Sequence, residues 1–134
     1  MAVDVDVRQL VIEYVTSVSE HRFERFEELL HPDVEFGGMA ADLRGAGAVA
    51  AGYRRLGPIL VRNDIKELVV DGDTAFVLYD FVTDTDAGAV LTGEFLRIAD
   101  GRIRAITLLF DWRRWPDVMR AVEERAAQAE PADV

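Results

Sequence analysis

Four strand-like segments follow one another through the second half of the chain, and they limit the possible folds more than any other feature. They are rich in β-branched and aromatic residues and span residues 65–70, 74–83, 89–98 and 102–110. The segments between them, residues 71–73, 84–88 and 100–101, have the composition of turns. Because such short connections join antiparallel neighbours, this half is expected to form a four-stranded meander.

The first half of the chain has helical spacing instead. Between Val7 and Val18, apolar side chains recur at offsets 0, 3, 4, 7, 8 and 11, which indicates one buried helix face that Asp4 or Asp6 can cap. Further helices are predicted over residues 22–30, 45–60 and 116–129, with a short extended piece at 34–36. Helices followed by hairpins predict an α+β domain, with the helices on one face of an antiparallel sheet.

The strand at residues 76–82 is apolar on both of its alternating faces. One face carries Phe76, Leu78 and Val82, and the other carries Val77, Tyr79 and Phe81. A sheet with one solvated face does not give this pattern. Because the helices can cover only one face, a second copy of the chain is expected to cover the other, which predicts a homodimer.

Composition excludes several classes of function. The 134 residues are expected to form one domain with a formal net charge of -10. That charge argues against nucleic-acid and membrane partners, and the sequence predicts a cytoplasmic protein without a leader or a membrane span. There is no cysteine and there are only two histidines, without metal-ligand spacing, so no metal and no cofactor are expected.

Two carboxylates interrupt apolar strand patterns and are candidates for catalysis. If the hairpin turns about Asp86, Asp80 lies opposite Thr92, and Asp80 and Glu94 become diagonal neighbours on one sheet face. Two acids in an apolar pocket raise at least one pKa, so one carboxyl can stay protonated near neutral pH. The alternative is structural: either acid could instead form an ion pair with an arginine at the sheet surface.

Three further residues are candidates with open alternatives. Asp111 ends the last strand between aromatic residues and either sits at a cavity mouth or pairs with a neighbouring arginine. Tyr14 lies in the apolar stripe of the first helix, where a buried hydroxyl needs a partner such as a pocket carboxylate, the backbone or water. Tyr53 on the third helix is a weaker candidate of the same kind.

With this order of elements, the chain resembles the nuclear transport factor 2-like superfamily. Within it, the chain is similar to the SnoaL-like polyketide cyclase, ketosteroid isomerase and limonene-epoxide hydrolase groups. The resemblance covers about residues 6–126 and rests on residues 29–36 (LLHPDVEF), Arg44-Gly45, residues 101–104 and residues 109–111. It implies one SnoaL-like domain over residues 1–134: a cone-shaped, cystatin-like α+β barrel. N-terminal helices pack on a curved antiparallel sheet, around an apolar cavity and commonly in a dimer.

The resemblance also implies roles for single residues. Tyr14 and Glu94 fall where ketosteroid isomerases place an oxyanion-hole tyrosine and a protonated acid, and Tyr53 matches a pocket tyrosine. Phe36, however, occupies the position of the isomerase general base. Against the epoxide hydrolases, Asp111 matches a terminal aspartate and Asp80 matches the aspartate of an Arg-x-Asp pair.

In that pair Leu78 replaces the arginine, so neither family's catalytic set is complete. In SnoaL-like cyclases a strand aspartate is the acid/base, a role open to Asp80 or Asp111.

The leading hypothesis is a cofactor-independent enzyme that performs isomerisation, aldol-type cyclisation or epoxide opening on a small apolar, uncharged or cationic substrate. Asp80 would be the acid/base, Glu94 and Tyr14 would donate hydrogen bonds to developing charge, and Asp111 would assist. The residues expected to contact the substrate are Tyr53, Phe36, Leu78, Phe110 and Trp112. The alternatives are a non-catalytic ligand-binding or dimerisation module, and an interaction domain whose cavity is filled by Phe36, Met39 and Trp112.

Overall fold

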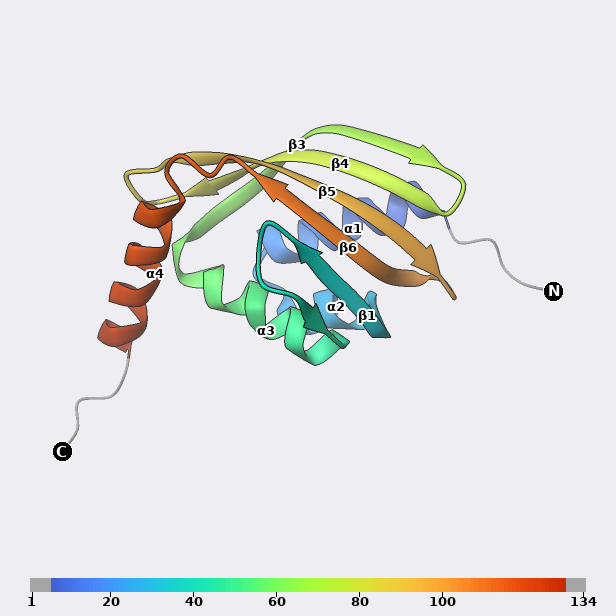
Figure 1. Cartoon of the computed structure of the whole chain (residues 1–134), viewed down its shortest axis with the longest axis horizontal. Helices are drawn as coiled ribbons and strands as arrows, with labels where there is room; N and C mark the ends of the chain where they lie inside the picture. Colours follow the sequence, from blue (N-terminus) through green and yellow to red (C-terminus); the bar gives the residue numbers. More distant parts are fainter. Residues whose placement is uncertain (1–5, 130–134) are drawn as a thin grey trace.

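The computed structural model describes residues 6–129, which form four α-helices and a curved six-stranded sheet (Figure 1). The helices are α1 (Val7–Ser19), α2 (Phe23–Glu28), α3 (Ala46–Leu56) and α4 (Trp115–Ala129), and a 3₁₀ turn, η1, covers Gly57–Ile59. The strands are β1 (Leu30–Gly38), β2 (Leu43–Arg44), β3 (Leu60–Asp71), β4 (Thr74–Thr83), β5 (Ala89–Ala99) and β6 (Arg102–Phe110).

The predicted meander is confirmed, and the sheet that contains it is open rather than closed into a barrel. Its strand order is β2-β1-β6-β5-β4-β3, with β3 to β6 antiparallel in sequence order. Irregular register between Ile65 and Glu67 in β3, and between Arg97 and Ile98 in β5, accompanies the curvature. Together with the helices, this sheet forms the expected cone-like α+β fold.

The first helix forms as its spacing predicts. The Asp6 side chain accepts a hydrogen bond from the Gln9 backbone N–H at 3.1 Å and so caps α1, while Asp4 lies outside the described residues. Leu10, Val11 and Val18 are buried against the sheet together with Tyr14. This packing fixes the direction in which the Tyr14 side chain points.

The strand β1 is longer than the short piece predicted at 34–36. It pairs in parallel with β6, from Leu30 opposite Ile103 to Gly38 opposite Leu108. The register shifts between Leu30 and Glu35, so Pro32 lies in a stretch without regular ladder pairing. Pro32 is therefore accommodated at an irregularity within the strand.

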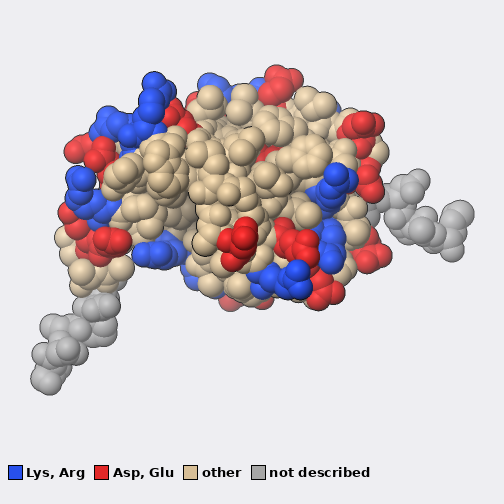
Figure 2. Space-filling view, viewed as in Figure 1, with Lys and Arg blue, Asp and Glu red and all other residues tan. Residues whose placement is uncertain are grey.

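Helices α1, α2 and α3 lie on one face of the sheet, and the other face is open. In Figure 1 the three helices lie beneath the strands, while α4 stands at one end against η1. We call the uncovered side the outer face; Val69, Leu91, Phe95 and Leu109 are its exposed large apolar residues. A broad uncharged region crosses the surface seen in Figure 2. Within residues 6–129, no helix is long and apolar enough to cross a membrane.

Candidate active site

All three tyrosines of the chain converge on one buried carboxylate, Glu94 of β5. The hydroxyls of Tyr14 on α1 and Tyr53 on α3 donate to Glu94 Oε1 at 2.6 Å and 3.0 Å. The hydroxyl of Tyr79 on β4 donates to Oε2 at 2.5 Å. We call these four residues the tyrosine–glutamate cluster. It joins two helices and two strands around a single acid.

Sheet register and aromatic packing hold the cluster in place. Glu94 lies directly opposite Val77, and Tyr79 lies opposite Thr92, so both functional side chains project from the helix-covered face. The Phe26 ring packs between two of the tyrosines, 5.0 Å from the ring centre of Tyr14 and 4.8 Å from that of Tyr53. Two of the three rings are therefore held by contacts other than their hydroxyl groups.

Burial sets the protonation behaviour of this cluster. It raises the pKa of Glu94 above its ordinary value of 4.5, although the three tyrosine hydrogen bonds act in the opposite direction. Burial, together with the nearby Glu94 charge, raises the pKa of Tyr14, Tyr53 and Tyr79 well above 10.0. The tyrosines therefore stay neutral, and Glu94 is the group in the cluster whose proton can exchange at the lowest pH.

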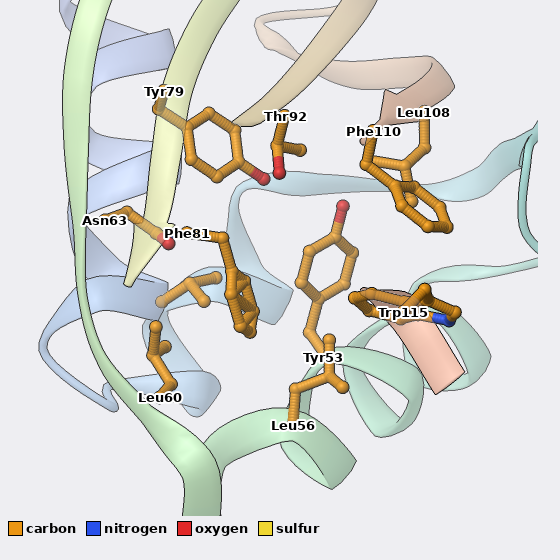
Figure 3. Close-up of a pocket in the computed structure, with 11 residues that line it drawn as sticks. Tyr53, Leu56, Leu60, Asn63, Tyr79, Phe81, Thr92, Leu108, Phe110 and Trp115 are labelled. Atoms are coloured by element: carbon orange, nitrogen blue, oxygen red, sulfur yellow. The ribbon is translucent and has the colours of Figure 1, made fainter. Parts of the chain in front are cut away.

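A small cavity of about 40 Å³ adjoins the cluster. Tyr53 and Tyr79 lie on its wall with Thr92, and Figure 3 shows their three hydroxyls directed toward the same interior region. Glu94 is not among the wall residues, but the hydroxyls of Tyr53 and Tyr79, which are, donate to it. This volume has room for a few waters or for the polar groups of a small ligand.

A larger apolar groove of about 480 Å³ lies next to the cavity. The two spaces share five wall residues: Tyr53, Leu56, Leu108, Phe110 and Trp115. Phe36, Met39 and Trp112 line the groove, and Arg55 is its one charged wall residue in the described chain. A groove of this size and character fits a small apolar molecule. Tyr53 is the residue that connects groove, cavity and acid.

Comparison with known proteins identifies the family. A family model described as the SnoaL-like domain matches residues 11–106, well over half of the chain. The chain belongs to the SnoaL-like family. No protein in a curated set matches this SnoaL-like chain.

Solved structures share the fold of this SnoaL-like domain at low sequence identity. A steroid Δ-isomerase from Pseudomonas aeruginosa is 14% identical, with a TM-score of 0.74 and 96% of each chain covered. A protein of Sinorhizobium meliloti, provisionally named a polyketide cyclase, is 22% identical with a TM-score of 0.68, covering 75% of this chain and 94% of that one. A designed protein with a curved β-sheet is 21% identical, with a TM-score of 0.74 and coverage of 89% and 95%. These likenesses show the fold.

The expectation that Asp80 and Glu94 share one face of the sheet is wrong. Asp80 lies opposite Leu91 rather than Thr92, so its side chain is on the outer face, where Lys66 Nζ contacts Oδ2 at 3.1 Å. Leu78 lies on the same outer face, opposite Gly93, and is not a wall residue of the cavity or the groove. A one-residue difference in register moves every side chain to the other face.

The β4–β5 loop explains this difference in register. The Thr83 backbone N–H donates to the Gly88 oxygen at 3.0 Å, which leaves a four-residue loop in place of the five residues centred on Asp86. Gly88 has a φ of 62°, in the left-handed region that glycine adopts readily, and the Thr83 hydroxyl also donates to the Gly88 oxygen. The Thr83 side chain and the left-handed backbone of Gly88 therefore define this turn. The alternation of apolar residues along the strands does not reveal either contribution.

The other predicted site residues divide between the cavity, the groove and the surface. Asp111 binds Arg113 through both carboxylate oxygens, and these hydrogen bonds hold the pKa of Asp111 at about 2. Asp111 lines neither the cavity nor the groove. Of its two predicted roles, pairing with a neighbouring arginine is therefore the one observed. Phe110 lines both spaces, whereas Phe36 and Trp112 line the groove without filling it. Tyr14 and Tyr53 both contact Glu94.

Two residues of the site are absent from the sequence-based candidates. Tyr79 alternates with Asp80 along β4, and only the true register shows that Tyr79, and not its neighbour, faces Glu94. Asn63 of β3 lies on the cavity wall opposite Phe81. The presence of three tyrosines in an otherwise apolar core pattern is the one sequence signal that could have indicated the cluster. In residues 6–129, no group of three or more His, Asp or Glu side chains is placed to hold a metal.

The raised pKa of Glu94 predicts the direction in which the stability of the protein changes with pH. Between its unfolded value near 4.5 and its higher folded value, the folded state binds more protons than the unfolded state. The stabilisation linked to the neutral acid is therefore complete below pH 4.5 and is lost as the pH rises through the folded pKa. We expect the stability of the wild type relative to Glu94→Gln to fall over this range, as measured by urea unfolding at a series of pH values. A difference that is flat or rises with pH would contradict the assignment.

Proposed function

We propose that this protein is a cofactor-independent enzyme that moves a proton next to the carbonyl group of a small, uncharged, apolar ketone, as in isomerisation or aldol-type cyclisation. The observation that carries the proposal is the tyrosine–glutamate cluster: a buried acid with a raised pKa, reached from an apolar groove through Tyr53. Burial moves the pKa of Glu94 upward, in the direction that suits a carboxyl group to general acid–base catalysis.

The groove supports an apolar substrate. Its walls are mainly aromatic and aliphatic, and its volume of about 480 Å³ lies within the range of small-molecule sites. Arg55, the one charged wall residue among those described, is solvent-exposed. A substrate carbonyl would reach the polar end of the site, where the hydroxyls of Tyr53 and Tyr79 lie on the cavity wall.

The proton would travel through Tyr53. The Tyr53 oxygen already donates its proton to Glu94 Oε1 at 3.0 Å, so it can accept a proton from the substrate α-carbon while passing its own to the carboxylate. The electron pair of the broken C–H bond forms an enolate. Once Glu94 is neutral it is a weaker acceptor, which frees the Tyr79 hydroxyl to donate to the enolate oxygen. Return of the proton by the same path, to the same or another carbon, completes the reaction.

Exchange of the α-protons of 2-tetralone in D₂O, followed by proton NMR, tests this proposal. We expect Tyr53→Phe to slow the protein-catalysed exchange by roughly 10²–10⁴-fold, because the relay oxygen is lost. Tyr14→Phe is the matched control: it also removes one hydrogen bond to Glu94, but Tyr14 does not line the cavity or the groove. Its exchange rate should fall by less than about ten-fold. Equal losses in the two variants would contradict a relay through Tyr53.

One observation favours a second function, a non-catalytic module that binds apolar ligands. Among the described residues, no carboxylate lies on the wall of the cavity or the groove. The same observation removes epoxide opening by Asp80 and Asp111 from the proposal. If 2-tetralone binds to the wild type and its α-protons exchange no faster than in buffer, the binding module is the correct description.

A further inference from the structure

The side-chain oxygen of Asn63 is the one buried side-chain polar atom in the described chain that has no hydrogen-bond partner. Asn63 lies on β3, and its backbone N–H donates to Ser19 Oγ at 2.9 Å. Its side-chain Nδ2 donates to the Val15 carbonyl oxygen at 3.5 Å. Because a carbonyl oxygen can only accept, this contact fixes the orientation of the amide and leaves Oδ1 as the free atom.

Asn63 is part of the cavity wall, and Figure 3 shows its side chain reaching the cavity from β3, on the side away from Leu108 and Phe110. A buried carbonyl oxygen without a donor costs free energy that folded proteins normally avoid. The cavity of about 40 Å³ is large enough for the donor group that would remove this cost.

The protein itself does not supply this donor. Three hydroxyls lie on the cavity wall, and each already donates its proton: those of Tyr53 and Tyr79 to Glu94, and that of Thr92 to the Val90 oxygen at 3.0 Å. The rest of the wall is mainly apolar, formed by residues such as Leu60, Phe81 and Leu108. A molecule that enters the cavity can supply the missing hydrogen bond.

We infer that the substrate is a hydroxyketone, whose hydroxyl group donates to Asn63 Oδ1 while its carbonyl reaches the tyrosine hydroxyls. This inference rests on the proposed function, and it adds a second point of recognition to the substrate. A hydroxyl is the smallest neutral donor group, which suits the cavity volume. Asn63 is then a positioning residue that selects hydroxylated ketones over plain ketones. A site built to bond a hydroxyl discriminates strongly against analogues without one.

The test compares 2-tetralone with its four isomers that carry one hydroxyl on the aromatic ring. Dissociation constants come from NMR titration of the ¹⁵N-labelled protein, and α-proton exchange is measured for the same five ketones. For the wild type, we expect at least one hydroxylated isomer to bind about ten-fold more tightly than 2-tetralone. In Asn63→Leu the ratio of the affinities for the hydroxylated isomer and for 2-tetralone should fall to about one. Asn63→Asp, which keeps an acceptor oxygen, should retain the preference.

The outcomes separate this inference from the proposed function. Tyr53→Phe should slow exchange for every ketone that binds and leave the preference for the hydroxylated isomer unchanged. If exchange proceeds in the wild type but all five ketones bind equally, or if Asn63→Leu keeps the preference, the inference is wrong and the proposed function stands. If 2-tetralone and its isomers neither bind nor exchange, the proposed function fails and this inference fails with it.

Discussion

Replacing Glu94 by alanine is expected to lower the free energy of unfolding by about 3 kcal/mol. The substitution leaves the hydroxyls of Tyr14, Tyr53 and Tyr79 without their acceptor in a buried site, and it also removes side-chain volume from the core. The substitution also removes the free-energy cost of burying the acid, which offsets part of this loss. The unpaired hydroxyls dominate, because each costs roughly 1–3 kcal/mol. Urea unfolding measures the difference.

Glu94→Gln is the matched variant, because it keeps the shape of the side chain. Its amide oxygen can accept from two tyrosines as Oε1 does, and its NH₂ can donate to the oxygen of the third, so the loss of stability should be about 1 kcal/mol. The amide cannot take up a proton, however, so 2-tetralone exchange should fall by roughly 10²–10⁴-fold. If Glu94→Gln folds and exchanges at the wild-type rate, Glu94 has no role in the mechanism. If Glu94→Ala is as stable as the wild type, Glu94 does not stabilise the fold.

The second large effect concerns the outer face of the sheet, for which we propose a second copy of the chain as the covering partner. Val69 of β3, Leu91 and Phe95 of β5, and Leu109 of β6 are 55%, 43%, 39% and 47% exposed. The Phe76 ring adds to this surface by lying over Gly93, where a Cβ atom would come within 2.8 Å of the ring. An apolar surface that crosses four strands and faces outward is typical of an interface.

We expect light scattering to give about twice the 15.0 kDa chain mass, and Phe95→Glu to weaken association at least about 100-fold. The matched control is Ile65→Glu. Ile65 is also 39% exposed, but it lies opposite Tyr79 on the helix-covered side of the sheet. The control should leave the mass unchanged. A monomeric wild type at micromolar concentration, or equal effects of the two substitutions, would exclude this interface.

Much of the fold could be predicted because local chemistry and tertiary structure agree. The bounds of β4 and β6 match the predicted segments 74–83 and 102–110, and α1 follows its apolar spacing and its Asp6 cap. The parallel pairing of β1 with β6 could not be predicted, because it joins segments about 70 residues apart and leaves no local pattern. The resemblance to a family supplied the sheet curvature that periodicity alone does not indicate.

The site was less predictable than the fold, since it depends on register. Asp80 is a candidate in the sequence because it is a charged residue within an apolar strand. In the structure it lies on the outer face and pairs with Lys66. Tyr79 is an ordinary strand residue in the sequence and becomes important only because Val77 lies opposite Glu94. Asn63 gives no signal at all, because the property that distinguishes it, an oxygen without a donor, exists only in three dimensions.

The hydrogen bonds to Glu94 close loops of very different length along the polypeptide. The partners Tyr79, Tyr53 and Tyr14 are 15, 41 and 80 positions away from Glu94. All three hydrogen bonds require α1, α3, β4 and β5 to be assembled around Glu94, so we expect the complete arrangement only in the fully folded chain. The titration of this single acid is therefore a spectroscopic reporter of completed folding: in a truncated or incompletely assembled polypeptide it should return to the behaviour of a solvated glutamate.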